Sequence, residues 1–476
     1  MAGLICGIAL AFLHGRDADV DEAYTLAEAR LPAAELIRVI ASRELNGSAH
    51  TILVAALPGP WSTDGAADAR WLSVLFFALG VAVLYAGLAR RNGPAAATTG
   101  LLLATCNPIT LSTAWTGRGY AMAFLWGVML WLSAARQIEN RRRSDDILWG
   151  TLAATSAYVH FFLVPLCLAQ WLFVSRERRW RRSDLPLAGA AIALLGWTPV
   201  AMFLIAGGDN GQLPDMPVPS LHDRIALLVD FLAAGFSGNR LGQFALVGVL
   251  GVGMLMALRT SAPRPRSHMW LGGVGCLAVL AATEAGSIVH PAMLTAKYLP
   301  IAASSLAAVV AVAAQTTSLR LQTVRRGLVA VYPLVLAVLT CSGLLLWGRA
   351  VMTEPSPGAT SWTAAAQYAE RWGTSSDVVT TMVPFEEHAA RRVVLRTRLA
   401  IVPAAPATAS EMLEASGYTD RDCLPAPPDG ADVWLFSTQS PYLAQHLPGA
   451  ARCSGLVVRS RAQIGFVTVI RLGRGR

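Results

Sequence analysis

Charged residues are scarce in this chain. Only 14% of its 476 residues are Asp, Glu, Lys or Arg, whereas a typical soluble domain has about 25%. Hydrophobic residues make up 54%, and the mean hydropathy is +0.47. This balance excludes an ordinary soluble globular protein and predicts a polytopic α-helical membrane protein. The formal net charge of +9 leaves two interpretations open, membrane topology or nucleic-acid binding, and the position of the basic residues decides between them.

Several motifs are also absent. No His-x-x-x-His or Cys-x-x-Cys spacing occurs, so no metal site is predicted. No glycine-rich phosphate-binding pattern stands between an expected strand and an expected helix, so neither ATP nor NAD is expected as a cofactor. Lysine occurs once, at Lys297, among 39 basic residues, and arginine therefore carries almost all of the positive charge.

Apolar segments recur over the first 349 residues, at lengths near those needed to cross a hydrocarbon core of about 30 Å. They lie at 2–13, 71–89, 95–113, 120–135, 147–175, 186–206, 241–258, 269–289, 298–315 and 327–348. Segment 147–175 is too long for one helix and has arginine clusters at both ends, so we predict two helices that turn near 158–162. This makes eleven spans. Segment 2–13 is short, so either the chain starts upstream or this helix is short; a cleaved signal peptide fits less well.

The arginines gather in alternate loops. Seventeen of them lie near 90–91, 136–143, 176–182, 259–266 and 320–326. The positive-inside rule assigns these loops to the cytoplasm of a multi-pass protein of the cell membrane. The external face then holds the first loop at 14–70, the turns at 115–119 and 290–297, the loop at 206–240, and everything after Arg349. The basic excess therefore serves topology, and no nucleic-acid partner is predicted.

The first external loop begins with four carboxylates in six residues. They are Asp17, Asp19, Asp21 and Glu22. Acidic groups beside a bilayer are costly to desolvate, so such a cluster indicates chemistry or binding of a polar group, although a solvated loop would look the same. Further on, Leu36, Ile37 and Ile40 share one helical face. We expect two short helices, interrupted by Pro32, which lie on the membrane surface or pack on the protein's own outer domain.

Other polar residues lie near the predicted external ends of spans. His160 at the helical turn and His290 before a proline could line one external cavity, and a structural role is the alternative for each. Glu284 falls inside an apolar run, where an acid is a functional candidate by default; a hydrogen bond to a neighbouring helix is its structural alternative.

Residues 350–476 have soluble character and predict a small extracytoplasmic α/β domain, separate from a transmembrane domain at 1–349. A helix is expected at 361–371 and strands at 377–383, 393–399, 432–436 and 466–472. Of the seven cysteines, only Cys423 and Cys453 fall here. An exported domain permits a disulfide, and we predict one between them.

The order of these features resembles the GT-C glycosyltransferases. The Asp-Glu pair in a long first loop, Arg118-Gly119-Tyr120 after the third span, and His290-Pro291 followed by Lys297-Tyr298 carry the resemblance. More narrowly, they are similar to protein O-mannosyltransferases, aminoarabinose transferases and their actinobacterial mannosyltransferase-like relatives. The resemblance covers about residues 17–350.

The resemblance implies a glycosyltransferase that transfers a sugar from a polyprenyl-phosphate carrier to a hydroxyl group of a glycan, lipid or protein. Mannose is the sugar that the resemblance favours. Asp21 would be the general base, with Glu22 orienting it or the acceptor, and Asp17 and Asp19 as rivals. The donor phosphate would be contacted by Arg118, Tyr120, Lys297 and Tyr298. Relatives tend to have arginine at the position of Lys297, and lysine lacks the pair of N–H donors with which arginine binds a phosphate in a bidentate manner. His50 lies where relatives have a second loop motif, which is degraded here.

The resemblance leaves the cofactor open, because some GT-C enzymes bind a divalent cation through acidic loops and the cluster at 17–22 could do so. Two other functions compete with transfer. One is a catalytically silent relative that binds cell-envelope polymer, and the other is a lipid or sugar transporter. Transporters commonly show two matched halves, which this sequence lacks.

Overall fold

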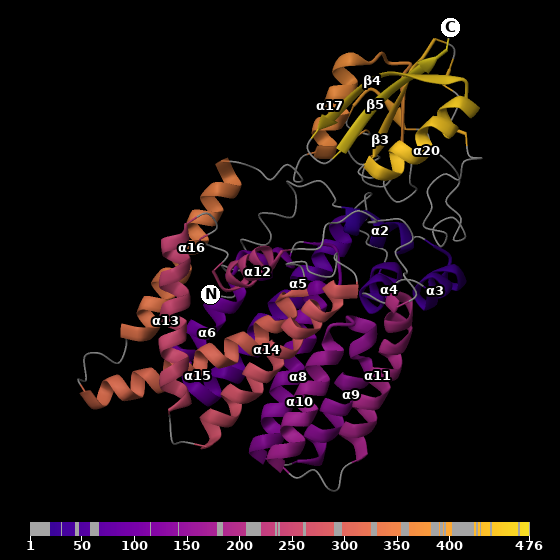
Figure 1. The fold of residues 1–476 in the computed structure, drawn as a ribbon. Coiled ribbons are helices and arrows are strands. Elements are labelled where there is room, and N and C mark those ends of the chain that lie inside the picture. The colour runs from indigo at the N-terminus through magenta and orange to yellow at the C-terminus, as the bar shows by residue number, and fades with distance from the viewer. Residues whose placement is uncertain are drawn as a thin grey trace.

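The computed structural model describes most of the chain. The described residues are 20–29, 31–42, 47–57, 66–114, 116–140, 142–178, 184–205, 220–233, 236, 239–259, 263–289, 298–324, 331–353, 361–381, 390, 394, 397–401, 423–424, 427–428, 430–437, 440–464 and 467–475. They form a helical bundle and a smaller sheet domain beyond one end of it (Figure 1).

The chain is mainly α-helical with a small C-terminal sheet domain, as the sequence predicts. The helices of the bundle are α5 (Ala66–Asn92), α6 (Pro94–Thr105), α7 (Pro108–Ser112), α8 (Tyr120–Asn140), α9 (Arg143–Val159), α10 (Leu163–Arg178), α11 (Asp184–Ile205), α12 (Leu221–Ala233), α13 (Arg240–Leu258), α14 (Pro263–Val289), α15 (Pro300–Val324) and α16 (Val331–Thr353). Among the described residues, five helices are long and apolar enough to cross a membrane: α5, α8, α13, α14 and α15. The predicted segment 2–13 lies outside the described residues.

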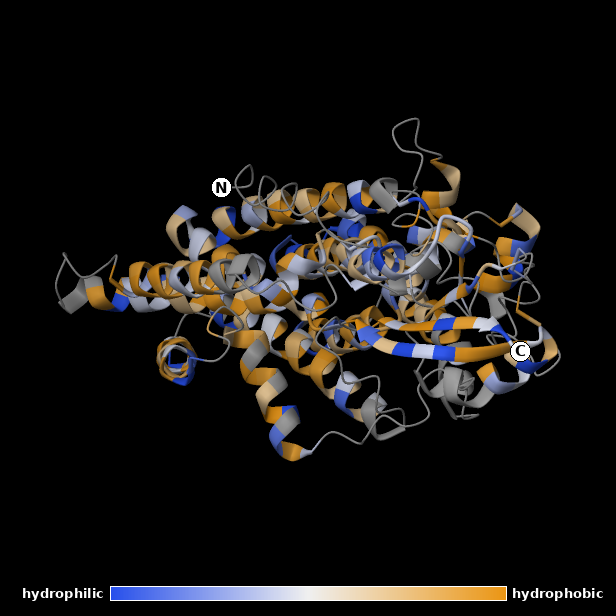
Figure 2. Ribbon diagram, turned by 90° about the horizontal axis from the view of Figure 1, so that it is seen from above, coloured by the Kyte–Doolittle hydropathy of each residue, from blue (hydrophilic) through white to orange (hydrophobic). Residues whose placement is uncertain are grey.

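Helix α15 forms the centre of the bundle. Its alanine-rich sequence is almost wholly buried, and α6, α8, α13 and α14 pack around it. Small side chains allow close approach, because a Cβ at Gly100 of α6 would collide with the carbonyl oxygen of Ala307. The outer helices are rich in hydrophobic residues (Figure 2), and some of these are exposed, among them Leu195, Leu241 and Phe244. An apolar exterior is what a bundle surrounded by lipid requires.

The predicted helical turn in segment 147–175 is confirmed. Helix α9 ends at Val159 and α10 begins at Leu163. The backbone at His160 is extended, and its carbonyl accepts the Leu163 N–H at 2.9 Å. Within the bundle, the Trp149 indole N–H donates to Gln170 Oε1 at 3.3 Å and links the two helices. The hairpin therefore returns the chain to the side of its arginine clusters.

The first loop contains the two expected helices and a third. They are α2 (Val20–Ala29), α3 (Ala33–Ser42) and α4 (Ser48–Ala56), and the break between α2 and α3 includes Pro32. On α3 the buried side chains are Leu36 and Val39, whereas Ile37 is 63% exposed. Leu36, Ile40 and Ile37 lie within an arc of about 100° on the helix, and Ile37 is at the exposed edge of that face. All three helices lie at the end of the bundle nearest the sheet domain (Figure 1).

The sheet domain combines helices α17 (Ser361–Trp372) and α20 (Ser440–Cys453) with five strands. The strands are β1 (Val378–Thr381), β2 (Ala400–Ile401), β3 (Val433–Ser437), β4 (Leu456–Ile464) and β5 (Val467–Arg474), in the spatial order β2-β1-β3-β5-β4. β1 pairs parallel with β2 and β3, whereas β5 pairs antiparallel with β3 and β4. Trp362 of α17 packs into the core with Trp434 and Val469.

The helix predicted at 361–371 and the strands predicted at 377–383, 432–436 and 466–472 correspond to α17, β1, β3 and β5. The strand predicted at 393–399 is wrong: Val394 is helical, residues 397–399 are irregular, and the strand begins at Ala400. β4 was missed because most of its side chains are exposed, which leaves no buried apolar alternation in the sequence.

Candidate functional site

A buried ion pair joins the first loop to the bundle. Glu22, in the first turn of α2, is only 3% exposed. Arg70, near the start of α5, donates through Nε to Glu22 Oε1 and through Nη2 to Oε2, both at 2.7 Å. Glu22 Oε1 also accepts the Gly117 backbone N–H at 2.6 Å. This carboxylate therefore connects α2, α5 and the turn that follows α7.

That turn, at residues 116–119, leaves no room for a side chain at its second residue. A Cβ at Gly117 would lie 2.9 Å from Ala69 Cβ and 3.1 Å from Glu22 Oε1. The next residue, Arg118, has its backbone carbonyl 3.2 Å from the Ser73 hydroxyl, which donates to it. Its guanidinium donates from Nη1 to Thr25 Oγ1 of α2 at 2.9 Å. Arg118 is thus half-buried and oriented by both α2 and α5.

Helix α4 packs against the same turn through two glycines. Gly47 precedes α4 with φ +89°, in the left-handed region, and a Cβ at Gly119 would lie 3.0 Å from Gly47 Cα and 3.4 Å from His50 Cβ. The Ser48 hydroxyl donates to the Tyr158 carbonyl at 2.8 Å and ties α4 to the end of α9. This close approach places His50 beside the turn that carries Arg118.

His50 is fully buried and held neutral. Burial, and to a smaller extent the positive charge of Arg118, lowers the pKa of its imidazole from 6.5 to about 4. A neutral imidazole can donate one hydrogen bond and accept another, so it can orient a neighbouring polar group without adding charge to the site.

Aromatic rings from three separate segments meet next to this turn. His160, at the break between α9 and α10, has its ring centroid 5.7 Å from that of Tyr120 and 5.6 Å from that of Tyr298. The Tyr120 and Tyr298 centroids lie 6.2 Å apart, and Phe162 is 4.8 Å from Tyr298. The Phe162 N–H donates to His160 Nδ1 at 3.3 Å. Tyr120 starts α8 directly after the turn, so the aromatic cluster and Arg118 belong to one site.

Six of the residues predicted from the sequence therefore converge: Glu22, His50, Arg118, Tyr120, His160 and Tyr298. They come from five stretches of the chain and meet at the end of the bundle that carries α2 and α4. The turn at residues 116–119 is the connection that they share.

The remaining predicted residues divide into two groups. Asp21 belongs to the first turn of α2, but its side chain lies outside the described part of the structure, as do Asp17, Asp19, His290 and Lys297. Glu284 of α14 forms an ion pair with Arg224 of α12, which corresponds to its structural alternative. In the sheet domain, Cys423 and Cys453 form a disulfide with a Cα–Cα distance of 5.2 Å.

Arg70, Thr25, Ser73 and Gly117 were missed by sequence reasoning. Arg70 lies just before an apolar segment, and an arginine at such a position is usually interpreted as a residue at the membrane interface. Nothing local connects it with Glu22, 48 positions earlier in the chain. As to metals, the described residues contain no group of three or more His, Cys, Asp or Glu side chains that could hold an ion.

Comparison with known proteins supports the class that the resemblance predicted. Residues 62–203 match the family described as dolichyl-phosphate-mannose-protein mannosyltransferase. Among curated proteins there is no significant sequence match.

The fold is similar to two crystal structures of ArnT from Cupriavidus metallidurans, each with a TM-score of 0.54. One is in the apo state and the other is bound to undecaprenyl phosphate. Sequence identities are 14% and 15%, and the alignments cover 98% of this chain and 97% of ArnT. An oligosaccharyltransferase from Archaeoglobus fulgidus aligns with a TM-score of 0.46 at 10% identity, over 100% of this chain and 74% of that one.

The fold and the site therefore define a polytopic membrane protein with the GT-C architecture. Residues 62–203 carry the sequence match to the mannosyltransferase family, and the fold as a whole is similar to that of ArnT.

Proposed function

We propose that this chain is a glycosyltransferase that moves a sugar from a polyprenyl-phosphate donor to an acceptor hydroxyl at the outer face of the cell membrane. The main support is the contact between helix α2 and the Arg118 turn: Glu22 accepts the Gly117 N–H, Thr25 accepts from Arg118, and the proposed base, Asp21, belongs to the same helix. The undecaprenyl phosphate bound to ArnT supports the donor class, and the matched family supports mannose as the sugar.

In the proposed reaction the acceptor oxygen attacks the anomeric carbon of the donor sugar. The new glycosidic bond forms as the bond between that carbon and the phosphate oxygen breaks, and polyprenyl phosphate leaves with the electron pair. The acceptor proton passes to a carboxylate acting as general base. Arg118, with Lys297, stabilises the negative charge that develops on the leaving phosphate.

Asp21 is the proposed general base, and Glu22 is proposed as a positioning residue. The two oxygens of Glu22 already accept three hydrogen bonds, from Arg70 and from Gly117, so this carboxylate is committed to holding the turn. Asp21 precedes it in the same helical turn. The Asp-Glu pair thus divides into one residue that acts and one that holds α2 against the Arg118 turn.

The aromatic cluster of Tyr120, His160 and Tyr298 is proposed to form the wall of the site where the donor phosphate enters. Aromatic side chains with one polar end suit the boundary between lipid and water, where a polyprenyl phosphate has its head group. Neutral His50 packs behind the turn and adds no positive charge that would compete with Arg118 for the phosphate.

The sheet domain after Arg349 is proposed to lie outside the cell, on the same side as the site. Its position near α2, α3 and α4 supports this arrangement (Figure 1). The disulfide between Cys423 and Cys453 supports it as well, because disulfides persist in oxidising compartments. The acceptor, a glycan, lipid or protein, would then approach between this domain and the membrane.

The test is sugar transfer in isolated membranes from a labelled polyprenyl-phosphate mannose donor to cell-envelope acceptors. Asp21→Asn and Arg118→Gln should each reduce the rate by about 10²-fold or more, because each removes one charge used in the reaction. Glu35→Gln and Arg38→Gln on α3 are matched controls, since they make the same chemical changes in the same loop, and they should leave the rate unchanged.

Undiminished transfer by Asp21→Asn would refute its role as base. No covalent product from any polyprenyl-linked sugar would favour the catalytically silent relative. Movement of substrate across sealed vesicles without a product would favour a transporter.

A further inference from the structure

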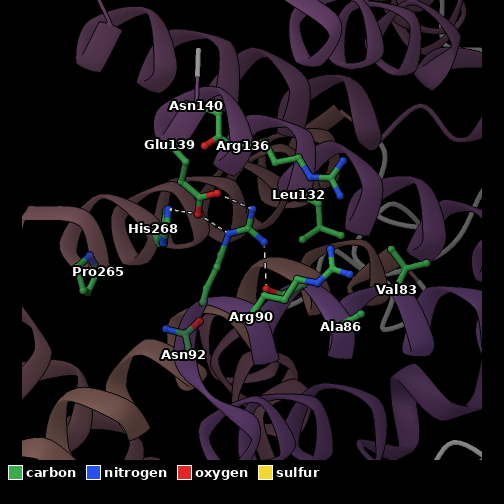
Figure 3. A pocket seen from close by; sticks show the side chains of 12 residues that line it. Val83, Ala86, Arg90, Asn92, Leu132, Arg136, Glu139, Asn140, Pro265 and His268 are labelled. Atoms are coloured by element: carbon green, nitrogen blue, oxygen red, sulfur yellow. Dashed lines mark hydrogen bonds and ion pairs between the residues drawn. The ribbon is translucent and has the colours of Figure 1, made fainter. Parts of the chain in front are cut away.

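A second site lies at the other end of the same helices. A cavity of about 710 Å³ opens between the ends of α5 and α8 and the start of α14 (Figure 3). Pockets of about 300–1,000 Å³ hold small ligands. We call it the basic cavity, after its lining residues Val83, Ala86, Gly87, Arg90, Arg91, Asn92, Leu132, Arg136, Glu139, Asn140, Pro265 and His268. Along α5 it is separated from Arg70 of the candidate site by twenty residues, or about 30 Å of helix.

One part of the cavity is a preformed ion network. Arg91 donates from Nε and Nη2 to the two oxygens of Glu139, at 2.6 and 3.0 Å, and from Nη1 to the Gly87 carbonyl at 3.0 Å. His268 Nε2 lies 3.2 Å from Glu139 Oε1. The side chains of Arg91 and His268 are only 10% and 7% exposed. Glu139, the only acidic residue in the lining, is therefore already neutralised by its neighbours.

Two further arginines add positive charge that this carboxylate does not balance. Arg90 and Arg136 extend away from the ion network, on the side of Val83 and Leu132 (Figure 3). Both are exposed, and among the described residues neither forms an ion pair. Guanidinium groups offer planar, paired N–H donors that match phosphate oxygens. The cavity is thus suited to an anion with several acceptor oxygens.

The surface that leads to these arginines is apolar. Leu75, Leu79, Val83 and Ala86 are exposed along one side of α5, at the spacing of successive helical turns, and Arg90 follows one turn later. From Leu75 to Arg90 this stripe runs about 22 Å, more than the half-thickness of a hydrocarbon core of about 30 Å. A ligand with a phosphate at one end and a hydrocarbon chain at the other fits both parts.

We propose that the basic cavity binds an anionic glycerophospholipid of the leaflet at this face, which the arginine-rich loops assign to the cytoplasm. Arg90 and Arg136 hold the phosphate, and an acyl chain follows the stripe on α5. Basic pockets between membrane helices on this side of a membrane bind anionic head groups by the same physics. The proposal is independent of the sugar-transfer reaction, because it uses no residue of the candidate site.

The experiment is native mass spectrometry of the full chain in neutral detergent, titrated with phosphatidylglycerol. One lipid should remain bound to the wild type. The double variant R90Q/R136Q should weaken its binding at least tenfold, because both phosphate ligands are lost. R142Q/R143Q is the matched control: it removes two exposed arginines at the same end of the bundle, outside the cavity, and should bind as the wild type does.

A second variant tests the cavity without changing its charge. Ala86→Trp fills the apolar wall and should also release the lipid, whereas Ala191→Trp makes the same change at an exposed position of α11 and should not. This comparison keeps the proposal testable if R90Q/R136Q fails to fold. Gel filtration and melting temperature identify any such failure.

Three results would overturn the proposal. The first is equal binding of phosphatidylglycerol by wild type and R90Q/R136Q. The second is equal binding of phosphatidylcholine, which would remove the requirement for an anion. The third is competition by free glycerol phosphate at the same concentration as the lipid, which would assign the cavity to a soluble phosphate.

Discussion

The ion pair between Glu22 and Arg70 should be one of the strongest single interactions in the protein. Their side chains are 4% and 2% exposed, and the guanidinium meets the carboxylate through two hydrogen bonds of 2.7 Å. Removing one partner leaves a buried charge, which typically costs about 3–5 kcal/mol. Arg70→Gln and Glu22→Gln should therefore each lower the free energy of unfolding by about that amount.

The double variant E22Q/R70Q should lose less than the sum of the two single losses. With both charges gone, two amides of similar length occupy the site and can hydrogen-bond to each other. The difference, a coupling energy, should be about 2–3 kcal/mol, at the upper end of measured values for residues in contact. Titration of each purified variant with a denaturing detergent measures the four free energies required.

Arg459 supplies the matched control, because it pairs with Asp432 at 3.3 Å while its own side chain is 51% exposed. Arg459→Gln should cost less than about 1 kcal/mol, since solvent screens its exposed guanidinium and the buried Asp432 keeps its closer ion pair with Arg471 at 2.6 Å. Additive losses in the Glu22 and Arg70 variants, or single losses no larger than that of Arg459→Gln, would refute the inference that this buried pair holds α2 to the bundle.

Two more predictions concern stability. The pKa of His50 is lowered from 6.5 to about 4, so the unfolded state binds the proton first, and up to about 3 kcal/mol of stability should be lost as pH falls through this range. His50→Asn should remove this loss of stability, whereas the control His222→Asn, at an exposed histidine, should not. The free energy of unfolding is measured against pH, and equal pH dependence in the wild type and His50→Asn would contradict the prediction. Reduction of the disulfide between Cys423 and Cys453, which lie 30 residues apart, should destabilise the sheet domain by about 3–4 kcal/mol. A reductant should therefore make that domain more sensitive to protease, in the wild type and equally in the control variant Cys341→Ser. Labelling of Cys423 by a thiol reagent without reductant would contradict this prediction.

The sequence determined the class of this protein, because membrane insertion depends on properties that add along a segment. Low charge and long apolar runs predicted the helical bundle, and the alternating arginine clusters required segment 147–175 to turn back, as α9 and α10 do. The helix at 361–371 and three strands followed from local periodicity. The order of short motifs also indicated Glu22, Arg118, Tyr120 and Tyr298 as one site.

Only the tertiary structure decided how those residues act together. The partner of Glu22 is 48 positions away and the N–H of Gly117 is 95 positions away, and no local pattern encodes contacts over such separations. Gly117 and Gly119 looked like ordinary turn residues until packing showed what a Cβ would meet. The basic cavity shows the same limit, because arginines that served topology in the sequence line one cavity at the helix ends. Hydropathy and charge are local sums along the chain, whereas a site depends on which helix faces meet, and that is settled by packing.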